Sequence, residues 1–184
     1  LVSSSIRVDV LVLLERSSDV YESLLELDNY AEILSEITLI ASWSIDPRIP
    51  PLCKQTIFYH RPLSTFRALI FEENDNSLPI AGPESVNASY EAAVALGFKK
   101  IHLFGADFSA VRRSKPRSVN ALGDTPRNLD VPMLGNRGRT IFTTSSLIVA
   151  RDTLNASIAI SKDVDICRYG EGLTMQGEIK DVIE

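Results

Sequence analysis

Apolar and polar positions follow two alternating patterns along the chain. Short runs rich in β-branched and other apolar residues are typical of strands buried on both faces, and the first such run covers residues 8–14. Segments with apolar residues three or four positions apart, typical of helices, stand between several of these runs. The further predicted strands are residues 37–45, 56–60, 100–105, 139–143, 164–167 and 173–179. This alternation predicts a three-layer α/β fold in which helices cover a mostly parallel sheet.

Local chemistry predicts where the helices begin and end. Ser17 and the two residues after it are good N-cap residues before an apolar stripe. Residues 85–96 form an Ala-rich segment between Pro83 and Gly97, and proline near the start with glycine after the end is typical of a helix. Residues 145–160 carry apolar side chains at helical spacing and predict another helix.

The composition is that of an ordinary globular domain. The chain has 184 residues, of which 45% are hydrophobic and 23% charged, and this length suits one domain over residues 1–184. The formal net charge of −5 argues against general attraction to nucleic acid or membranes. Cys53 and Cys167 form no CxxC pair, so a reduced, cytoplasmic setting is expected. Because the chain opens without Met and enters a strand almost at once, we expect it to lack an upstream segment.

The fold class predicts where a ligand binds. In open α/β sheets, ligands lie beyond the carboxyl ends of the strands. The residues at the ends of the predicted strands are therefore candidates for nucleotide or substrate binding: Glu15, Arg16, His60, Gly105, Asp107, Thr143 and Glu171. Asp163 and Asp165 form a DxD pattern, but they fit a solvated turn that enters a strand, so no metal or cofactor is predicted.

Basic residues concentrate between residues 112 and 139. This segment holds seven arginines or lysines, including Arg112 and Arg113, against only Asp124 and Asp130, so it carries +5 while the rest of the chain carries −10. A long basic loop in an acidic protein suits an anionic ligand such as a phosphate or a sugar carboxylate, which arginine binds through paired hydrogen bonds. The alternative is a solvated loop whose charge serves solubility or an oligomer contact.

Two glycine-containing turns add further candidates. The run from Gly82 through Ser85 to Asn87 places a glycine turn against a helix start, where free backbone N–H groups can bind an anion. Good helix capping explains the same residues without a ligand. The turn that contains Gly135 and Asn136 could hold the backbone in left-handed conformations close to a ligand, or could be a tight turn before the next strand.

Two residues are candidates for proton transfer. Asp107 lies just beyond a predicted strand, where it could orient a hydroxyl group or take its proton, although aspartates at such places often cap the following turn. His60 ends another predicted strand, and histidine is a frequent general acid or base. His102 lies inside a predicted strand and is expected to be a core or edge residue whose polar atoms are satisfied.

Several of these motifs occur together, and in the same order, in a known family. The segment from Gly82 to Asn87 and the strand that leads to Asp107 resemble the signature of the motility accessory factor proteins. These proteins belong to the wider grouping called domain of unknown function 115, or MptE-like. Further similar segments are a Glu-Arg pair, a Gly-Asn turn and a closing acidic turn, at Glu15, Arg16, Gly135, Asn136 and Glu171.

The resemblance implies a Rossmann-like, sialyltransferase-like fold and a function. A glycosyltransferase of this kind takes a nonulosonic acid from a CMP-sugar and transfers it to flagellin or to another protein or glycan acceptor. By the resemblance, Asn87, Asp107 and Asn136 lie near donor or acceptor, and Glu15 and Arg16 border the pocket. The expected mechanism is inverting displacement at the anomeric carbon, in which one of the two candidate bases takes the acceptor proton. A pterin-type diphosphokinase, known from the archaeal branch, and a non-catalytic binding domain are the alternatives.

Overall fold

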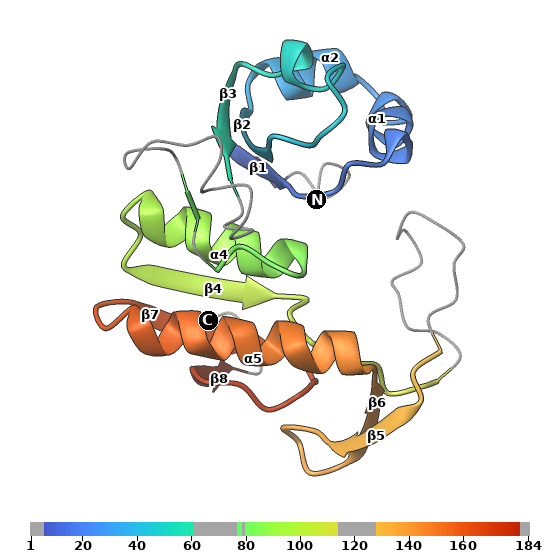
Figure 1. Cartoon of the computed structure of the whole chain (residues 1–184), viewed down its shortest axis with the longest axis vertical. Helices are drawn as coiled ribbons and strands as arrows, with labels where there is room; N and C mark the ends of the chain where they lie inside the picture. The colour runs from blue at the N-terminus through green and yellow to red at the C-terminus, as the bar shows by residue number, and fades with distance from the viewer. Residues whose placement is uncertain (1–5, 61–76, 79, 114–127, 181–184) are drawn as a thin grey trace, which may run out of the picture. The chain divides into compact units, whose positions relative to one another are not determined.

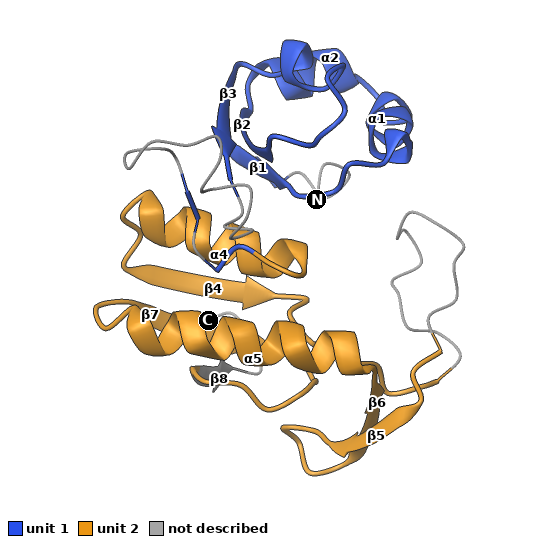
Figure 2. Cartoon of the chain, viewed as in Figure 1, with its two compact units in different colours: residues 1–81 blue, residues 82–184 orange. Residues whose placement is uncertain are grey.

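The structure is a computed structural model of the 184-residue chain, and it describes residues 6–60, 77–78, 80–113 and 128–180. The chain divides into two compact units, Leu1–Ala81 and Gly82–Glu184, which Figure 2 shows in separate colours. Each unit contains parallel strands with helices packed against them. The expected α/β class with mostly parallel strands is therefore confirmed.

Unit 1, residues 1–81, is built on three parallel strands in the order β1-β2-β3. They are β1 (Val10–Leu13), β2 (Thr38–Ser42) and β3 (Gln55–Tyr59). The connections between them hold two α-helices and one 3-10 helix, namely α1 (Ser18–Leu25), α2 (Tyr30–Ser35) and η2 (Pro50–Leu52) (Figure 1).

The core of unit 1 forms between the strands and α1. Leu39 and Ala41 of β2 are fully buried, and because they stand two residues apart they point to the same face of the sheet. Val20 and Leu24 of α1 pack against this cluster. Their spacing of four residues places both on one side of the helix, which is why this apolar pattern covers the sheet.

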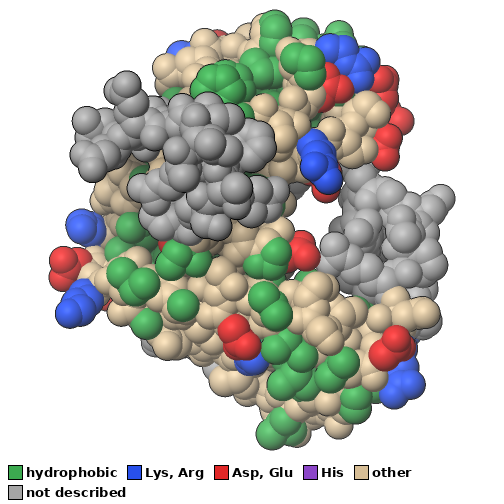
Figure 3. Space-filling view, in the orientation of Figure 1, with side chains coloured by type: hydrophobic (Ala, Val, Ile, Leu, Met, Phe, Trp, Pro, Cys, Tyr) green, Lys and Arg blue, Asp and Glu red, His purple; other side chains and the backbone are tan. Residues whose placement is uncertain are grey.

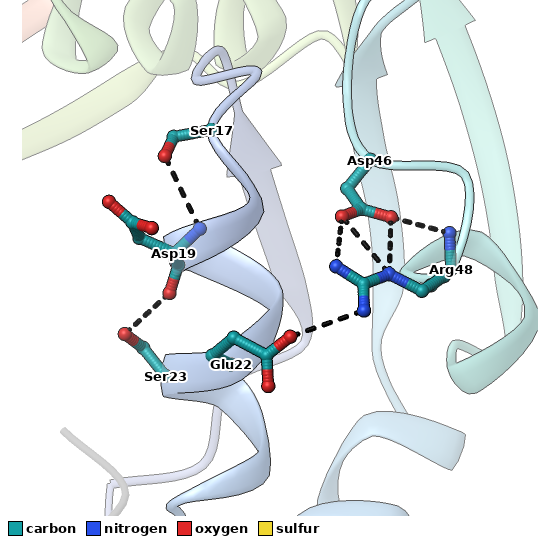
Figure 4. A network of polar contacts seen from close by, with 6 residues as sticks. All are labelled: Ser17, Asp19, Glu22, Ser23, Asp46 and Arg48. Atoms are coloured by element: carbon teal, nitrogen blue, oxygen red, sulfur yellow. Dashed lines mark hydrogen bonds and ion pairs between the residues drawn. The ribbon is translucent and has the colours of Figure 1, made fainter.

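A polar cluster ties α1 to the loop that follows β2 (Figure 4). The Arg48 guanidinium donates to the Asp46 carboxylate at 2.7–3.2 Å and to Oε1 of Glu22 at 3.2 Å. The same guanidinium lies 4.0 Å from the centre of the Tyr21 ring. Because Glu22 and Tyr21 belong to α1 and Asp46 to the loop, this cluster, here called the Arg48 clamp, fixes the loop after β2.

Unit 2, residues 82–184, contains a second parallel sheet and a hairpin. The sheet has the order β4-β7-β8, with β4 (Lys100–Phe104), β7 (Asp165–Tyr169) and β8 (Glu178–Lys180). The antiparallel hairpin consists of β5 (Val131–Leu134) and β6 (Thr140–Thr143). Two helices run beside β4, namely α4 (Ser85–Ala95) and α5 (Ser145–Ile160) (Figure 1).

The core of unit 2 lies between this sheet and the two helices. Ile101 and Leu103 of β4 and Ile166 of β7 are buried together with Tyr90 of α4 and Leu154 of α5. The residues of β4 that point the other way are exposed, so its burial alternates along the strand. The helices therefore cover one face of β4, and this face carries the apolar positions.

The structure decides or corrects several sequence expectations. Of the two places expected for His102, the core or an edge, the structure shows the edge: β4 is an edge strand of the described sheet, and His102 is exposed because only every second residue of β4 faces the helices. Helix α2 and strand β5 were not predicted, since each is short and neither shows a clear period. The strand expected at residues 173–179 forms only at β8.

None of the helices in the described part of the chain is long and apolar enough to cross a membrane. On the face drawn in Figure 3, acidic and basic side chains are interspersed rather than gathered into one patch.

Candidate functional site

The strongest candidate site in unit 2 lies where β4 and β7 end. These strands are parallel neighbours, so their carboxyl ends meet at the same edge of the sheet. Asp107 follows β4, and a turn formed by Gly170, Glu171 and Gly172 follows β7. The backbone N–H of Leu173 donates to the carbonyl oxygen of Asp107 at 3.0 Å, which joins the two segments.

Glycine makes this close approach possible. A Cβ atom at Gly172 would lie 2.3 Å from the carbonyl oxygen of Asp107, far inside ordinary contact. A Cβ atom at Gly170 would lie 3.0 Å from Oδ1 of Asp107, and Gly170 also has a φ of +100°, which favours glycine. The Asp107 carboxyl group therefore rests directly against the turn after β7.

Asn136 holds the same turn from the β5–β6 hairpin. Its backbone N–H donates to the carbonyl of Gly172 at 2.9 Å, and its Nδ2 donates to the carbonyl of Gly170 at 3.2 Å. Its Oδ1 accepts the backbone N–H of Gly172 at 3.1 Å. The predicted Gly-Asn turn thus lies beside the predicted acidic turn, and the described side-chain bonds of Asn136 fix the backbone of that turn.

Glu171 forms an ion pair with Arg139, which directly precedes β6 in the hairpin. Both of its carboxylate oxygens accept hydrogen bonds from the Arg139 guanidinium. The Glu171 side chain is 11% exposed and that of Arg139 is 61% exposed, so the pair closes the outer side of the turn. The hydrogen bonds from Arg139 lower the pKa of Glu171, and the charge of Arg137 adds to this effect. Glu171 therefore stays ionised at neutral pH.

Burial changes the acidity of the Asp107 carboxyl group. Loss of hydration raises its pKa, the negative charge of Glu171 raises it further, and the positive charge of Arg168 opposes both effects. Arg168 is a buried residue of β7, and its Nη1 donates to the carbonyl of Leu173 at 2.9 Å. A carboxylate with a raised pKa is a better proton acceptor, so this environment suits a general base.

The segment after Asp107 leads to the basic residues. Thr143 is fully buried, and its Oγ1 donates to the carbonyl of Phe108 at 2.6 Å, which holds this segment against β6. The Arg113 guanidinium lies over the Phe142 ring, 4.7 Å from its centre, and Arg112 is exposed. Residues 114–127 of the predicted basic loop lie outside the described residues.

The predicted anion site at the start of α4 is built differently. Asn87 is buried, its Oδ1 accepts the backbone N–H of Glu84 at 3.3 Å, and its Nδ2 donates to the carbonyl of Ala150 in α5 at 2.9 Å. These contacts cap α4 and join it to α5. A ligand role for Asn87, Gly82 and Ser85 stays a prediction.

In unit 1, the predicted residues again follow the ends of parallel strands. Glu15 and Arg16 come after β1, and Oε1 of Glu15 accepts the backbone N–H groups of Arg16 at 2.8 Å and of Ser17 at 3.2 Å. His60 comes directly after β3 and stacks on Trp43, which comes directly after β2. Sequence reasoning missed Trp43. Its signal was the single tryptophan of the chain, near the end of the strand predicted at residues 37–45.

Comparison with known proteins decides the family. The model of the family "6-hydroxymethylpterin diphosphokinase MptE-like" matches residues 1–113 of this chain. The chain belongs to the MptE-like family. Among curated proteins, no sequence matches it. The resemblance inferred from the Gly82–Asp107 segment and the Glu-Arg pair is confirmed.

A solved structure extends the comparison over nearly the whole MptE-like chain. The MAf glycosyltransferase from Magnetospirillum magneticum AMB-1 is similar with a TM-score of 0.77 and 26% sequence identity. The similarity covers 97% of this chain and 27% of that protein, so the chain spans about a quarter of that protein's length. With the parallel strands described above, this match confirms the Rossmann-like α/β fold.

Proposed function

We propose that this chain is the donor-binding part of a glycosyltransferase that uses a CMP-activated nonulosonic acid. The observation that carries the proposal is the half-buried carboxyl group of Asp107, held against a glycine turn at the carboxyl ends of β4 and β7. The similarity of 97% of the chain to a MAf glycosyltransferase supports it. The acceptor is a hydroxyl group of a protein such as flagellin, or of a glycan.

The basic residues near Asp107 fit the charge of such a donor. A CMP-nonulosonic acid carries a phosphate and a carboxylate, and guanidinium groups bind both anions through paired, charge-assisted hydrogen bonds. Arg112 and Arg113 stand five and six residues after Asp107. The Phe142 ring lies under Arg113, so this guanidinium is partly oriented before a ligand binds.

The proposed reaction is a direct displacement. The Asp107 carboxylate takes the proton of the acceptor hydroxyl group, and the acceptor oxygen forms a bond to the anomeric carbon. The bond from that carbon to the phosphate oxygen breaks, and its electron pair leaves with CMP. Arg112 and Arg113 stabilise the negative charge that develops on the departing phosphate. His60 of unit 1 is the alternative base.

Calorimetric titration of the chain with CMP tests the binding step. We expect saturable binding that Arg113→Ala weakens about tenfold, since a hydrogen bond to a charged group contributes about 1.5–3 kcal/mol. Arg7→Ala is the matched control, because Arg7 is an exposed arginine of unit 1 that pairs with Asp9. Equal loss of affinity in both variants, or no binding of CMP, would contradict the proposal.

Release of CMP from CMP-sialic acid, with and without an acceptor, tests the chemical step. Asp107→Asn should keep CMP affinity and lower turnover about 100-fold or more, the range expected for loss of a general base. Unchanged turnover would remove Asp107 from the mechanism. If the matching loss occurs in His60→Gln, His60 is the base.

The name of the matching family model favours a second candidate, diphosphate transfer to a pterin. This reaction needs ATP with a divalent cation and 6-hydroxymethylpterin. Titration with ATP and magnesium, beside the CMP titration, distinguishes the two. Binding of ATP with pterin pyrophosphorylation, and no binding of CMP, would replace the first proposal by the second.

A further inference from the structure

An aromatic stack stands at the carboxyl edge of the unit 1 sheet. The Trp43 ring lies 4.8 Å from the Phe58 ring and 5.4 Å from the His60 ring, between centroids. Trp43 is 62% exposed. The exposed indole is a large aromatic surface on which a planar ligand can stack.

Phe58 and His60, the two rings that stack with Trp43, hold it in place. Phe58 and His60 stand two residues apart at the end of β3, so both point to the same face of the sheet. Phe58 also packs against the buried core of unit 1. The Trp43 and His60 rings are nearly parallel, with an angle of 4° between their planes. With 62% of Trp43 exposed, the stack presents indole surface to the solvent.

The backbone that carries Trp43 is fixed as well. The hydroxyl groups of Ser42 and Ser44, on either side of Trp43, lie 3.0 Å apart and share a hydrogen bond. Ile45 donates its backbone N–H to the carbonyl of Ser42 at 3.2 Å, and its side chain is buried. The Arg48 clamp then ties the rest of this loop to α1 (Figure 4). A fixed platform loses little conformational entropy when it binds a ligand.

We propose that the Trp43–His60 stack binds the planar base of a nucleoside or nucleotide. This inference rests on the proposed function in one respect, namely that the substrate is a nucleotide derivative. Three observations carry it: the exposed Trp43 ring that lies parallel to His60, the anchorage of Phe58 in the core, and the place of Trp43 and His60 directly after β2 and β3. That edge is where ligands of open parallel sheets bind.

The described residues at this edge suit a neutral ring. Among them, Glu15 and Arg16 follow β1 at the same edge of the sheet, and their formal charges cancel. The Glu15 carboxylate already accepts the backbone N–H groups of Arg16 and Ser17, which would otherwise be available to a phosphate. A base that stacks on the indole needs no charged partner, because every base has an aromatic face.

Intrinsic fluorescence gives a direct test, because Trp43 is the only tryptophan of the chain. The chain is titrated with cytidine, uridine, adenosine and guanosine, and separately with methyl pyranosides and inorganic phosphate. We expect saturable quenching or a shift of the emission by at least one nucleoside. The pyranosides and phosphate should leave the emission unchanged. Saturable quenching by a pyranoside and by no nucleoside would overturn the proposal in favour of a sugar-binding surface.

Variants separate this inference from the proposed function. By calorimetry, Trp43→Ala should weaken nucleoside binding about tenfold, and Trp43→Phe should restore part of the loss. Phe98→Ala is the matched control, because Phe98 is 55% exposed and precedes β4, at the end of that strand opposite to Asp107. Circular dichroism checks that each variant is folded.

The possible outcomes differ for the two proposals. If Trp43→Ala binds nucleosides as tightly as the unmodified chain while CMP binding depends on Arg113, the stacking site is refuted and the proposed function survives. If nucleosides quench Trp43 but no sugar transfer occurs, the stacking site stands and the glycosyltransferase assignment fails. If no nucleoside or nucleotide binds by either method, both are refuted.

Discussion

Gly172→Ala tests the contact on which the Asp107 site depends. The Cβ atom would lie 2.3 Å from the carbonyl oxygen, 2.6 Å from the Cα and 2.8 Å from the carbonyl carbon of Asp107. These are backbone atoms, so no side chain can rotate away. Ordinary contacts of a Cβ atom lie at 3.4–4 Å. The two backbone segments must therefore move apart by about 1 Å.

The cost follows from two contributions. Overpacking of this kind destabilises a protein by about 1–3 kcal/mol. The hydrogen bond from the Leu173 N–H to the Asp107 carbonyl would be broken, which adds about 0.5–1.5 kcal/mol. We expect a loss of about 2–4 kcal/mol in the free energy of unfolding of unit 2. For a unit of about 100 residues, this lowers the melting temperature by at least about 8 °C.

Thermal and urea unfolding measure this loss, and CMP titration measures the accompanying displacement of the site. Gly138→Ala is the control, since a Cβ atom there has nothing within 4 Å and only its φ of +75° opposes the substitution. We expect about 1 kcal/mol of destabilisation from that backbone strain, with CMP binding retained. If Gly172→Ala is as stable as the unmodified chain, the close approach of the two turns is refuted.

Three further substitutions test the electrostatics and packing of unit 2. Burial raises the pKa of Asp107 above its ordinary 3.8, so the folded state favours the protonated carboxyl group. This stabilisation is fully present below pH 3.8 and is lost as pH rises through the raised pKa. Asp107→Asn should therefore be more stable than the unmodified chain at pH 7 in urea unfolding, and a less stable variant contradicts this. Arg139 lowers the pKa of Glu171 below its ordinary 4.5, so the ionised carboxylate stabilises the folded state. This stabilisation is present above pH 4.5 and is lost as pH falls through the lowered pKa. Glu171→Gln should flatten the dependence of the melting temperature on pH, and an unchanged profile speaks against the ion pair. Asn87→Ala removes the hydrogen bond to the Ala150 carbonyl and the side-chain oxygen that accepts the backbone N–H of Glu84, the N-cap residue of α4. It should cost about 2 kcal/mol in urea unfolding, whereas Ser85→Ala, at an exposed position, should cost less than about 0.5 kcal/mol.

Local patterns were sufficient for most of the elements. Helix α5 has the bounds expected from its apolar spacing, and Thr144 caps it by accepting the backbone N–H of Leu147. Ser17 caps α1 in the same way, through the N–H of Asp19. These features depend on residues within a few positions of one another, so the sequence itself contains their causes.

Short or half-exposed elements could not be predicted from the pattern. Strand β5 has four residues, including Pro132, and becomes a strand only by pairing with β6. His102 looked like a residue of a strand buried on both faces, yet the helices of unit 2 cover only the opposite face of β4. Partners distant in sequence decided both cases.

The sequence by itself determined the α/β class, the family, and the edge of each sheet at which chemistry is expected. Only the tertiary structure decided which residues meet there. Asp107 lies against Gly170 and Gly172, more than sixty positions away, and Trp43 stacks on His60 from the neighbouring strand. Secondary structure follows from local backbone preferences, whereas these contacts exist only after parallel pairing brings distant strand ends together.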